Sequence, residues 1–206
     1  DNEVSYNSTY SLAVPEIENK KCFVKNVEGI VTGDANISLY YSDIDVYDGT
    51  SVSESLSGTG EENDPYIVAS GADLAFIKTK VSEGEFFANK YFKLTKSIDL
   101  TNAADFVIGT SGTNSFKGIL NGSKCVIYGF NINKTSAGSA LFCALGDGGE
   151  ISNITVDGTV IGRQYTGSIV GRNLGTLKNI INYSTVTNDA ANGVGGICGG
   201  GTGTIL

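Results

Sequence analysis

The 206-residue chain contains no histidine, methionine or tryptophan, and only two prolines and four cysteines. Without histidine, a Ser-His or Cys-His nucleophile is excluded, and a zinc site would need thiolates and carboxylates alone. The cysteines lie far apart and lack C-x-x-C spacing, which favours buried free thiols: Cys22, Cys125, Cys143 and Cys198. A disulfide between Cys125 and Cys143 is the alternative, because stacked segments could bring these two residues close.

Long apolar runs and clusters of basic residues are also missing. No stretch approaches the roughly 18 apolar residues of a membrane span, and the chain begins with Asp1, so neither a span nor a signal peptide is visible. The net charge is −8: residues 1–105 carry 18 Asp or Glu against 8 Lys, whereas residues 106–206 carry 4 against 6 Lys or Arg. Nucleic acids and anionic membranes require clustered cations, so both are excluded as partners.

What the sequence does contain is a Gly-punctuated repeat over residues 139–206. Segment 141–143 aligns with 169–171 and 197–199 at steps of 28 residues, and 150–154 aligns with 176–180 at a step of 26. This period is typical of a solenoid whose rungs each hold three short strands. We therefore expect an all-β fold, a right-handed parallel β-helix. The chain stops partway through a repeat, which predicts further rungs in a longer parent protein.

Asn153 and Asn179 occupy the same position of consecutive repeats. Side-chain amides stacked at one position can hydrogen-bond along a solenoid axis. We interpret the pair as a structural ladder in preference to a ligand contact.

Residues 70–83 predict a short helix in front of the repeats. Ser70 is a suitable N-cap, Asp73 complements the helix dipole, and Gly84 is a suitable C-terminal stop. Leu74, Ile77 and Val81 form one apolar stripe, with which the helix can cap the end of the β-stack. Alternating apolar and polar residues over 92–100 then predict a half-buried strand.

Residues 1–57 predict a small antiparallel β unit that is separate from the solenoid at 58–206. Short β-prone runs at 21–24, 29–31 and 37–41 are divided by turn residues. The run 40–48 alternates acidic and apolar residues and is similar to the last strand of a jelly-roll or lectin-like sandwich. Residues 49–63 are small and polar, so we interpret them as a linker or an extended connection.

Two binding hypotheses concern this acidic region. Asp43, Asp45 and Asp48 could supply oxygen ligands to calcium, a possible cofactor, with Glu61, Glu62 and Asp64 nearby in the sequence. Tyr40, Tyr41 and Tyr47 could stack on sugar rings.

Residues 58–206 resemble bacterial cell-surface proteins with GLUG-type repeats. The resemblance rests on 60–68, 72–75, 89–100, 116–122, 127–132, 165–171 and 175–179. It implies an extracellular, cell-surface or wall-anchored protein and supplies no catalytic residues. The expected function is a non-enzymatic adhesin or spacer that binds a glycan or a host or neighbour-cell protein. The alternative is an accessory region of a secreted carbohydrate-degrading enzyme or surface protease.

Candidate catalytic groups in the repeats are few. Asp147 and Glu150 share a Gly-rich turn, which we interpret as solvated in preference to a glycosidase pair. Arg163 and Arg172 are interpreted as surface residues, and the glycines at 199–203 as a repeat turn because no lysine follows them.

Overall fold

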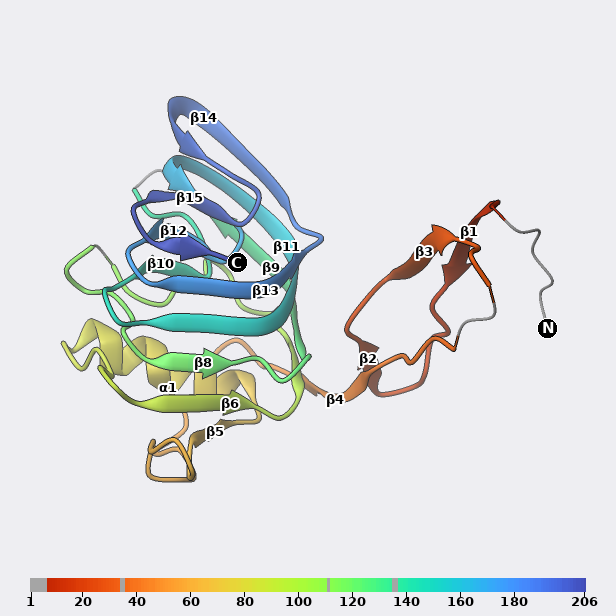
Figure 1. Cartoon of the computed structure of the whole chain (residues 1–206). Helices are drawn as coiled ribbons and strands as arrows, with labels where there is room; N and C mark the ends of the chain where they lie inside the picture. The colour runs from red at the N-terminus through yellow and green to blue at the C-terminus, as the bar shows by residue number, and fades with distance from the viewer. Residues whose placement is uncertain (1–6, 34–35, 111, 135–136) are drawn as a thin grey trace.

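The structure is a computed structural model that describes residues 7–33, 36–110, 112–134 and 137–206. It is a parallel β-helix with one short helix and a projecting N-terminal arm, defined here as residues 7–33 and 36–40 (Figure 1). This is the all-β solenoid that the repeats predict. No helix in the described residues is long and apolar enough to cross a membrane.

The solenoid has three walls of parallel strands. The first wall stacks β5 (Tyr66–Val68), β6 (Tyr91–Leu94), β8 (Ile119–Asn121), the start of β11 (Glu150–Thr166), β13 (Thr176–Asn182) and β16 (Thr204–Ile205). The second wall contains β4 (Tyr41–Val46), β7 (Ser97–Asp99), β9 (Val126–Asn133), the rest of β11, and β14 (Thr185–Val194). The third contains β10 (Phe142–Leu145), β12 (Val170–Asn173) and β15 (Cys198–Gly201).

The strand register confirms both repeat steps. Phe142 is paired with Val170, which is paired with Cys198, and this reproduces the step of 28 residues. Glu150 is paired with Thr176, which reproduces the step of 26. The repeat pattern therefore predicted which strands are neighbours and their alignment.

Inward side chains of successive rungs stack into one apolar core. On the first wall, Phe92, Leu120, Ile151 and Leu177 are paired in register and are all buried. Phenylalanine rings continue the stack across the lower rungs, with centroids 5.4 Å apart between Phe92 and Phe116 and 5.3 Å apart between Phe116 and Phe142. Such rings favour tilted and edge contacts, as here.

Helix α1 (Gly71–Ser82) confirms the predicted capping element. The Ser70 hydroxyl accepts from the Asp73 amide, and Gly84 has a φ of +97°, which a glycine adopts without strain. The predicted stripe of Leu74, Ile77 and Val81 is buried in the solenoid core. The helix lies at the β5–β6 end of the stack (Figure 1).

The N-terminal arm contains β1 (Thr9–Ala13), β2 (Lys20–Cys22) and β3 (Asn26–Ile30). β1 and β3 form an antiparallel ribbon that stands away from the solenoid, and β2 is antiparallel to β4 (Figure 1). The predicted small antiparallel unit is therefore present. Residues 37–40 belong to no strand, although the sequence favours one there.

Three sequence expectations need correction or refinement. The run 40–48 is not the edge of a sandwich, because β4 within it pairs in parallel with β7 of the solenoid. Of the two interpretations of residues 49–63, a linker and an extended connection, the structure favours the extended connection, because the Ser53 amide donates to the Ala72 carbonyl and Leu56 packs on the core. The expected strand at 92–100 is divided into β6 and β7. The boundary at residue 57 stays a prediction, although one sheet includes strands from both sides of it.

Candidate functional site

The outer surface of the first wall carries an open groove of about 640 Å³, which we name the lateral groove. The groove crosses β6, β8, β11 and β13, which lie one above the other in Figure 1. Its lining comes from several rungs: Glu62, Pro65, Tyr91, Phe92, Lys93, Ile119, Asn121, Glu150, Ser152, Asn153, Lys178 and Asn179. It therefore runs along the solenoid axis and across the strands.

Strand alternation explains why this surface is polar. On each strand of the first wall, the residues before and after the buried core residue point outward. The strand register places one set of them in a line across four rungs: Lys93, Asn121, Ser152 and Lys178. A second outward line contains Tyr91, Ile119, Glu150 and Thr176. Each of the four rungs thus contributes two or three residues to the lining of the groove.

The charged side chains of the groove balance each other in number. Lys93 and Lys178 are exposed, as is Glu62, while Glu150 is half-buried. None of the four belongs to an ion pair among the described residues. The groove is therefore neutral overall, and its charges are available to a ligand.

Three asparagine amides form a ladder along the groove. Asn179 Nδ2 donates to Asn153 Oδ1 at 3.0 Å, and Asn153 Nδ2 donates to Asn121 Oδ1 at 3.2 Å. The first contact is the ladder that the repeat position predicts. Asn121 extends it by one rung, and the 26-residue step did not identify this residue. In the strand register Asn121 is paired with Ser152, one position before Asn153, so the repeat alignment carried no signal for it.

Tyr91 is the aromatic residue of the groove that sequence reasoning missed. It is half-buried at the start of β6 and forms no ring contact or hydrogen bond through its side chain among the described residues. An unpaired tyrosine ring in a polar groove can pack against an apolar ligand face, and its hydroxyl can hydrogen-bond at the rim. Tyr91 directly precedes the buried Phe92 in β6. Strand alternation was therefore the signal that could have placed Tyr91 on the outer surface.

The predicted tyrosines do not form one surface. Tyr47 is 5% exposed, packs edge-on against Phe106, and donates its hydroxyl to the Ser51 carbonyl, so it is a core residue and the sugar hypothesis is wrong for it. Tyr40 is 52% exposed, but Lys124 Nζ lies 3.3 Å from its ring centroid. Tyr41 donates its hydroxyl to the Pro15 carbonyl at 2.7 Å.

The predicted calcium ligands are each engaged in different structural contacts. Asp43 forms an ion pair with Lys20 at 2.5 Å, and Asp45 accepts from the Gly71 amide at the start of α1 at 2.9 Å. Asp48 accepts from the amides of Thr50 and Ser51 in a tight turn. No cluster of three or more His, Cys, Asp or Glu suited to a metal occurs in the described part of the chain. The calcium site remains only a prediction.

All four cysteines are free, so the alternative of a Cys125–Cys143 disulfide is wrong. Burial raises the pKa of the Cys125, Cys143 and Cys198 thiols. Thiols held protonated in this way are poor nucleophiles. Asp147, Arg163 and Arg172 are exposed, as expected of surface residues.

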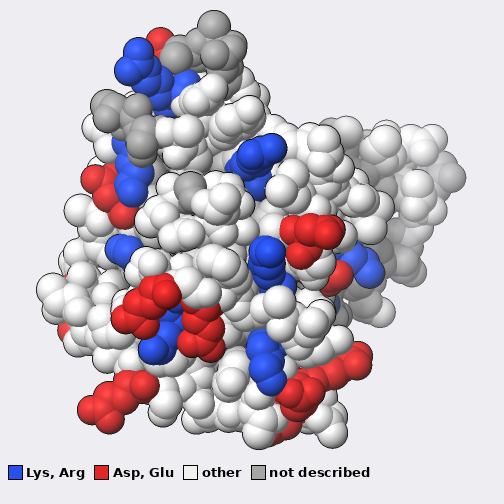
Figure 2. All heavy atoms as spheres, turned by 90° about the vertical axis from the view of Figure 1, so that its left-hand side faces the viewer, with Lys and Arg blue, Asp and Glu red and all other residues white. Residues whose placement is uncertain are grey.

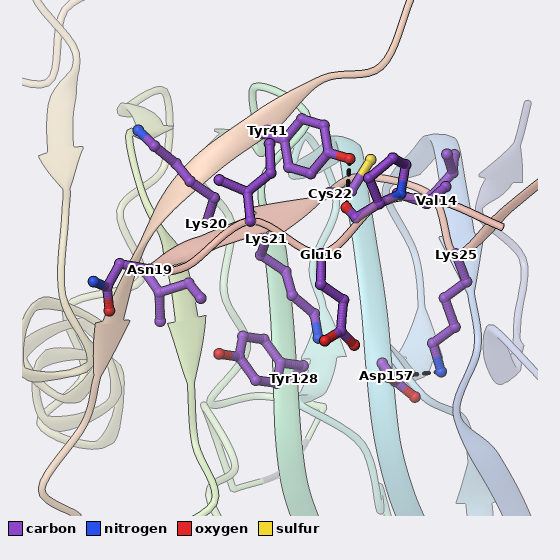
Figure 3. A pocket seen from close by; sticks show the side chains of 14 residues that line it. Val14, Glu16, Asn19, Lys20, Lys21, Cys22, Lys25, Tyr41, Tyr128 and Asp157 are labelled. Carbon is purple, nitrogen blue, oxygen red and sulfur yellow. Dashed lines mark hydrogen bonds and ion pairs between the residues drawn. The ribbon is translucent and has the colours of Figure 1, made fainter.

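A second cavity, the arm pocket, lies between the N-terminal arm and the second wall and has a volume of about 450 Å³ (Figure 3). Lys25 forms an ion pair with Asp157 at 2.8 Å, and Lys21 Nζ lies 4.2 Å from the ring centroid of Tyr128. Burial, followed by the nearby Asp99, raises the pKa of Tyr128 to about 12. These contacts hold the arm against the solenoid, so we interpret the arm pocket as a junction.

The face of the molecule in Figure 2 carries charges of both signs. Figure 2 shows one side of the molecule, on which Lys and Arg lie close to Asp and Glu and large areas are uncharged. A phosphate-binding surface would show a continuous basic patch, which is missing from this face.

Comparison with known proteins gives two relatives. No protein-family model matches the chain, and no solved structure matches it. The chain is 28% identical to halomucin of Haloquadratum walsbyi over 182 residues, covering 82% of this chain and 2% of halomucin. It is 31% identical to a Gly-rich membrane protein of Evansella cellulosilytica over 134 residues, covering 60% of this chain and 15% of that protein. The chain thus spans a small part of the curated relatives it matches, and the resemblance to GLUG-type repeats stays a prediction.

Proposed function

We propose that the chain is a non-enzymatic module of an extracellular surface protein, an adhesin or spacer that binds a glycan or protein partner through the lateral groove. The observation that carries the proposal is the groove itself, with its ladder of amides and its unpaired charges on successive rungs. A rigid solenoid suits this role because its repeated faces give extended binding surfaces.

The relatives support the location. One relative is named halomucin and the other a Gly-rich membrane protein, and both are much longer than this chain. A domain that forms a small part of a long surface protein is suited to spacing or adhesion. The GLUG-type resemblance points to the same setting, outside the cell or on its surface.

The chemistry of the chain supports a role in binding. Histidine is missing from the sequence, and three of the four thiols have pKa values raised by burial. Glu62 and Glu150 are the two carboxylates that line the groove, and a glycosidase would require such a pair at about 5–10 Å with one acid held protonated. Substitution of one glutamate of this pair, here Glu150, therefore tests whether the groove binds a polysaccharide or hydrolyses it.

Two measurements test the proposal. The chain is incubated with purified neutral and acidic polysaccharides and with unfolded peptides, and both retention and cleavage products are measured. We expect retention of at least one class without cleavage. Cleavage by the wild-type chain that disappears in Glu150→Gln would overturn the non-enzymatic role, and failure to retain any class would reduce the module to a spacer.

A further inference from the structure

We infer that the ligand of the lateral groove is a neutral, extended polysaccharide that lies along the solenoid axis, with Tyr91 packed on one sugar ring and the asparagine ladder bound to sugar hydroxyls. This inference rests on the proposed function and names the ligand class. It follows from the unused hydrogen-bonding capacity of the ladder, from its spacing, and from the charge of the groove.

The ladder amides are only partly used by the protein. A side-chain amide offers two N–H donors and two acceptor positions. Asn153 spends one donor on Asn121 and one acceptor position on Asn179, which leaves one donor and one acceptor. Asn121 accepts from the Ser123 amide and from Asn153, so both of its donors remain. Adjacent donors and acceptors of this kind match the hydroxyl pairs of a sugar.

The spacing of the ladder matches a polymer of sugars. Neighbouring rungs are about 4.8 Å apart, which is close to the length of one pyranose in an extended glycan. The groove runs from Tyr91 to Asn179 over three rung steps, or roughly 14 Å. A glycan along the axis would therefore place about one sugar on each of four rungs.

Charge and backbone pairing argue against other ligands. The groove carries two lysines and two glutamates, so a strongly anionic polymer has no net attraction to it. A peptide usually binds a β-protein by pairing with a free strand edge. The strands under the groove are paired on both sides, so this mode of peptide binding is not offered here.

The sharpest variant is Asn121→Asp. A carboxylate keeps both accepted hydrogen bonds, from Ser123 and Asn153, but removes the two free donors. Asn131→Asp is the matched control, because Asn131 is also exposed on a strand but lies outside the groove. Tyr91→Ala and Tyr91→Phe form a second pair that separates ring packing from the hydroxyl.

Binding is measured by isothermal titration with neutral glucan, mannan and xylan oligosaccharides of two to eight sugars, and with an oligogalacturonate. We expect a neutral oligosaccharide to bind with an affinity that rises up to about four sugars and then levels off. Asn121→Asp and Tyr91→Ala should each weaken it about tenfold, whereas Asn131→Asp and Tyr91→Phe should change it less than about threefold. Thermal unfolding checks that each variant is folded.

Three results would overturn the inference. Preferential binding of the oligogalacturonate that is lost in Lys178→Gln would show an acidic ligand and leave the proposed function standing. Binding of peptides with no neutral glycan bound would show a protein ligand and would also leave the proposed function standing. Retention of the whole neutral panel by Asn121→Asp at wild-type affinity would place the ligand elsewhere on the molecule.

Discussion

The N-terminal arm and the solenoid are both made of β-strands, but they are stabilised differently. In the described part of the arm no residue is buried, and each strand of its ribbon alternates only between exposed and half-buried positions. In the solenoid, one continuous core runs from Tyr47 to Leu177. A two-stranded ribbon of this kind has little stability of its own, whereas stacked rungs bury apolar surface cooperatively.

The contacts between the two regions are mostly polar. The Thr155 hydroxyl donates to the Phe23 carbonyl at 2.7 Å, and the Lys25 amide donates to the Tyr183 hydroxyl at 3.2 Å. The Lys25–Asp157 ion pair is a further polar contact, and β2 joins the arm to the second wall through its backbone pairing with β4. The arm is therefore a local element whose unfolding need not unfold the solenoid. The predictions below test this difference.

The largest effect is expected from Phe116→Ala in the aromatic stack. Phe116 is fully buried and contacts Phe92 and Phe142, so its loss leaves a cavity in the core. We expect the free energy of unfolding to fall by about 3–5 kcal/mol. Urea denaturation followed by circular dichroism measures this change.

Leu12→Ala in β1 is the control in the arm, because Leu12 is half-buried. We expect it to lower the free energy of the main transition by less than about 1 kcal/mol. Equal losses in the two variants would show that the arm and the solenoid unfold as one unit.

A smaller effect is expected from the ladder. Asn153 has a φ of +53°, a left-handed conformation that alanine adopts only with strain, and its amide forms two ladder bonds. Asn153→Ala should cost about 2–3 kcal/mol in the same denaturation experiment. Asn153→Gly loses the same bonds without the strain, so it should cost less. An identical cost for both would show that the strain contributes nothing.

The solenoid was predictable from the sequence because its structure is periodic. Segments such as 141–143 and 169–171 repeat because the same turn and the same inward side chain are required on each rung, and the register follows from the period. The helix was predictable for a local reason, since Ser70, Asp73 and Gly84 carry the cap chemistry.

The arm and the groove were less predictable, because they depend on contacts without a period. Tyr40, Tyr41 and Tyr47 are close in the sequence, yet they have a cation, a carbonyl group and the core as their respective neighbours. Asp43, Asp45 and Asp48 likewise have separate partners. Asn121 and Tyr91 join the groove only because distant rungs are stacked, and composition cannot show such stacking.

A local effect is expected when the contact between the regions is weakened. The carboxylate of Asp157 and the ammonium group of Lys25 are partly exposed, so their ion pair contributes at most about 1 kcal/mol. Asp157→Asn should therefore leave the thermal midpoint nearly unchanged while cleavage of the arm by a protease becomes faster. Asp189→Asn, an exposed control outside the contact, should change neither. A large fall in the midpoint would contradict the separation of the two regions.

The smallest effect is expected in acid, at the turn that joins β4 to the rest of the solenoid. The Ser51 hydroxyl, then the Ser51 and Thr50 amides, donate to the Asp48 carboxylate and lower its pKa from 3.8 to about 2. Because the folded state prefers the charged form, this stabilisation is present above the unfolded pKa and is lost as the pH falls from about 4 to about 2. Asp48→Asn keeps an acceptor for the two amides but does not titrate. Thermal midpoints measured between pH 5 and pH 2 should therefore depend less on pH in this variant than in the wild type, and parallel curves would show that Asp48 has no part in the acid response.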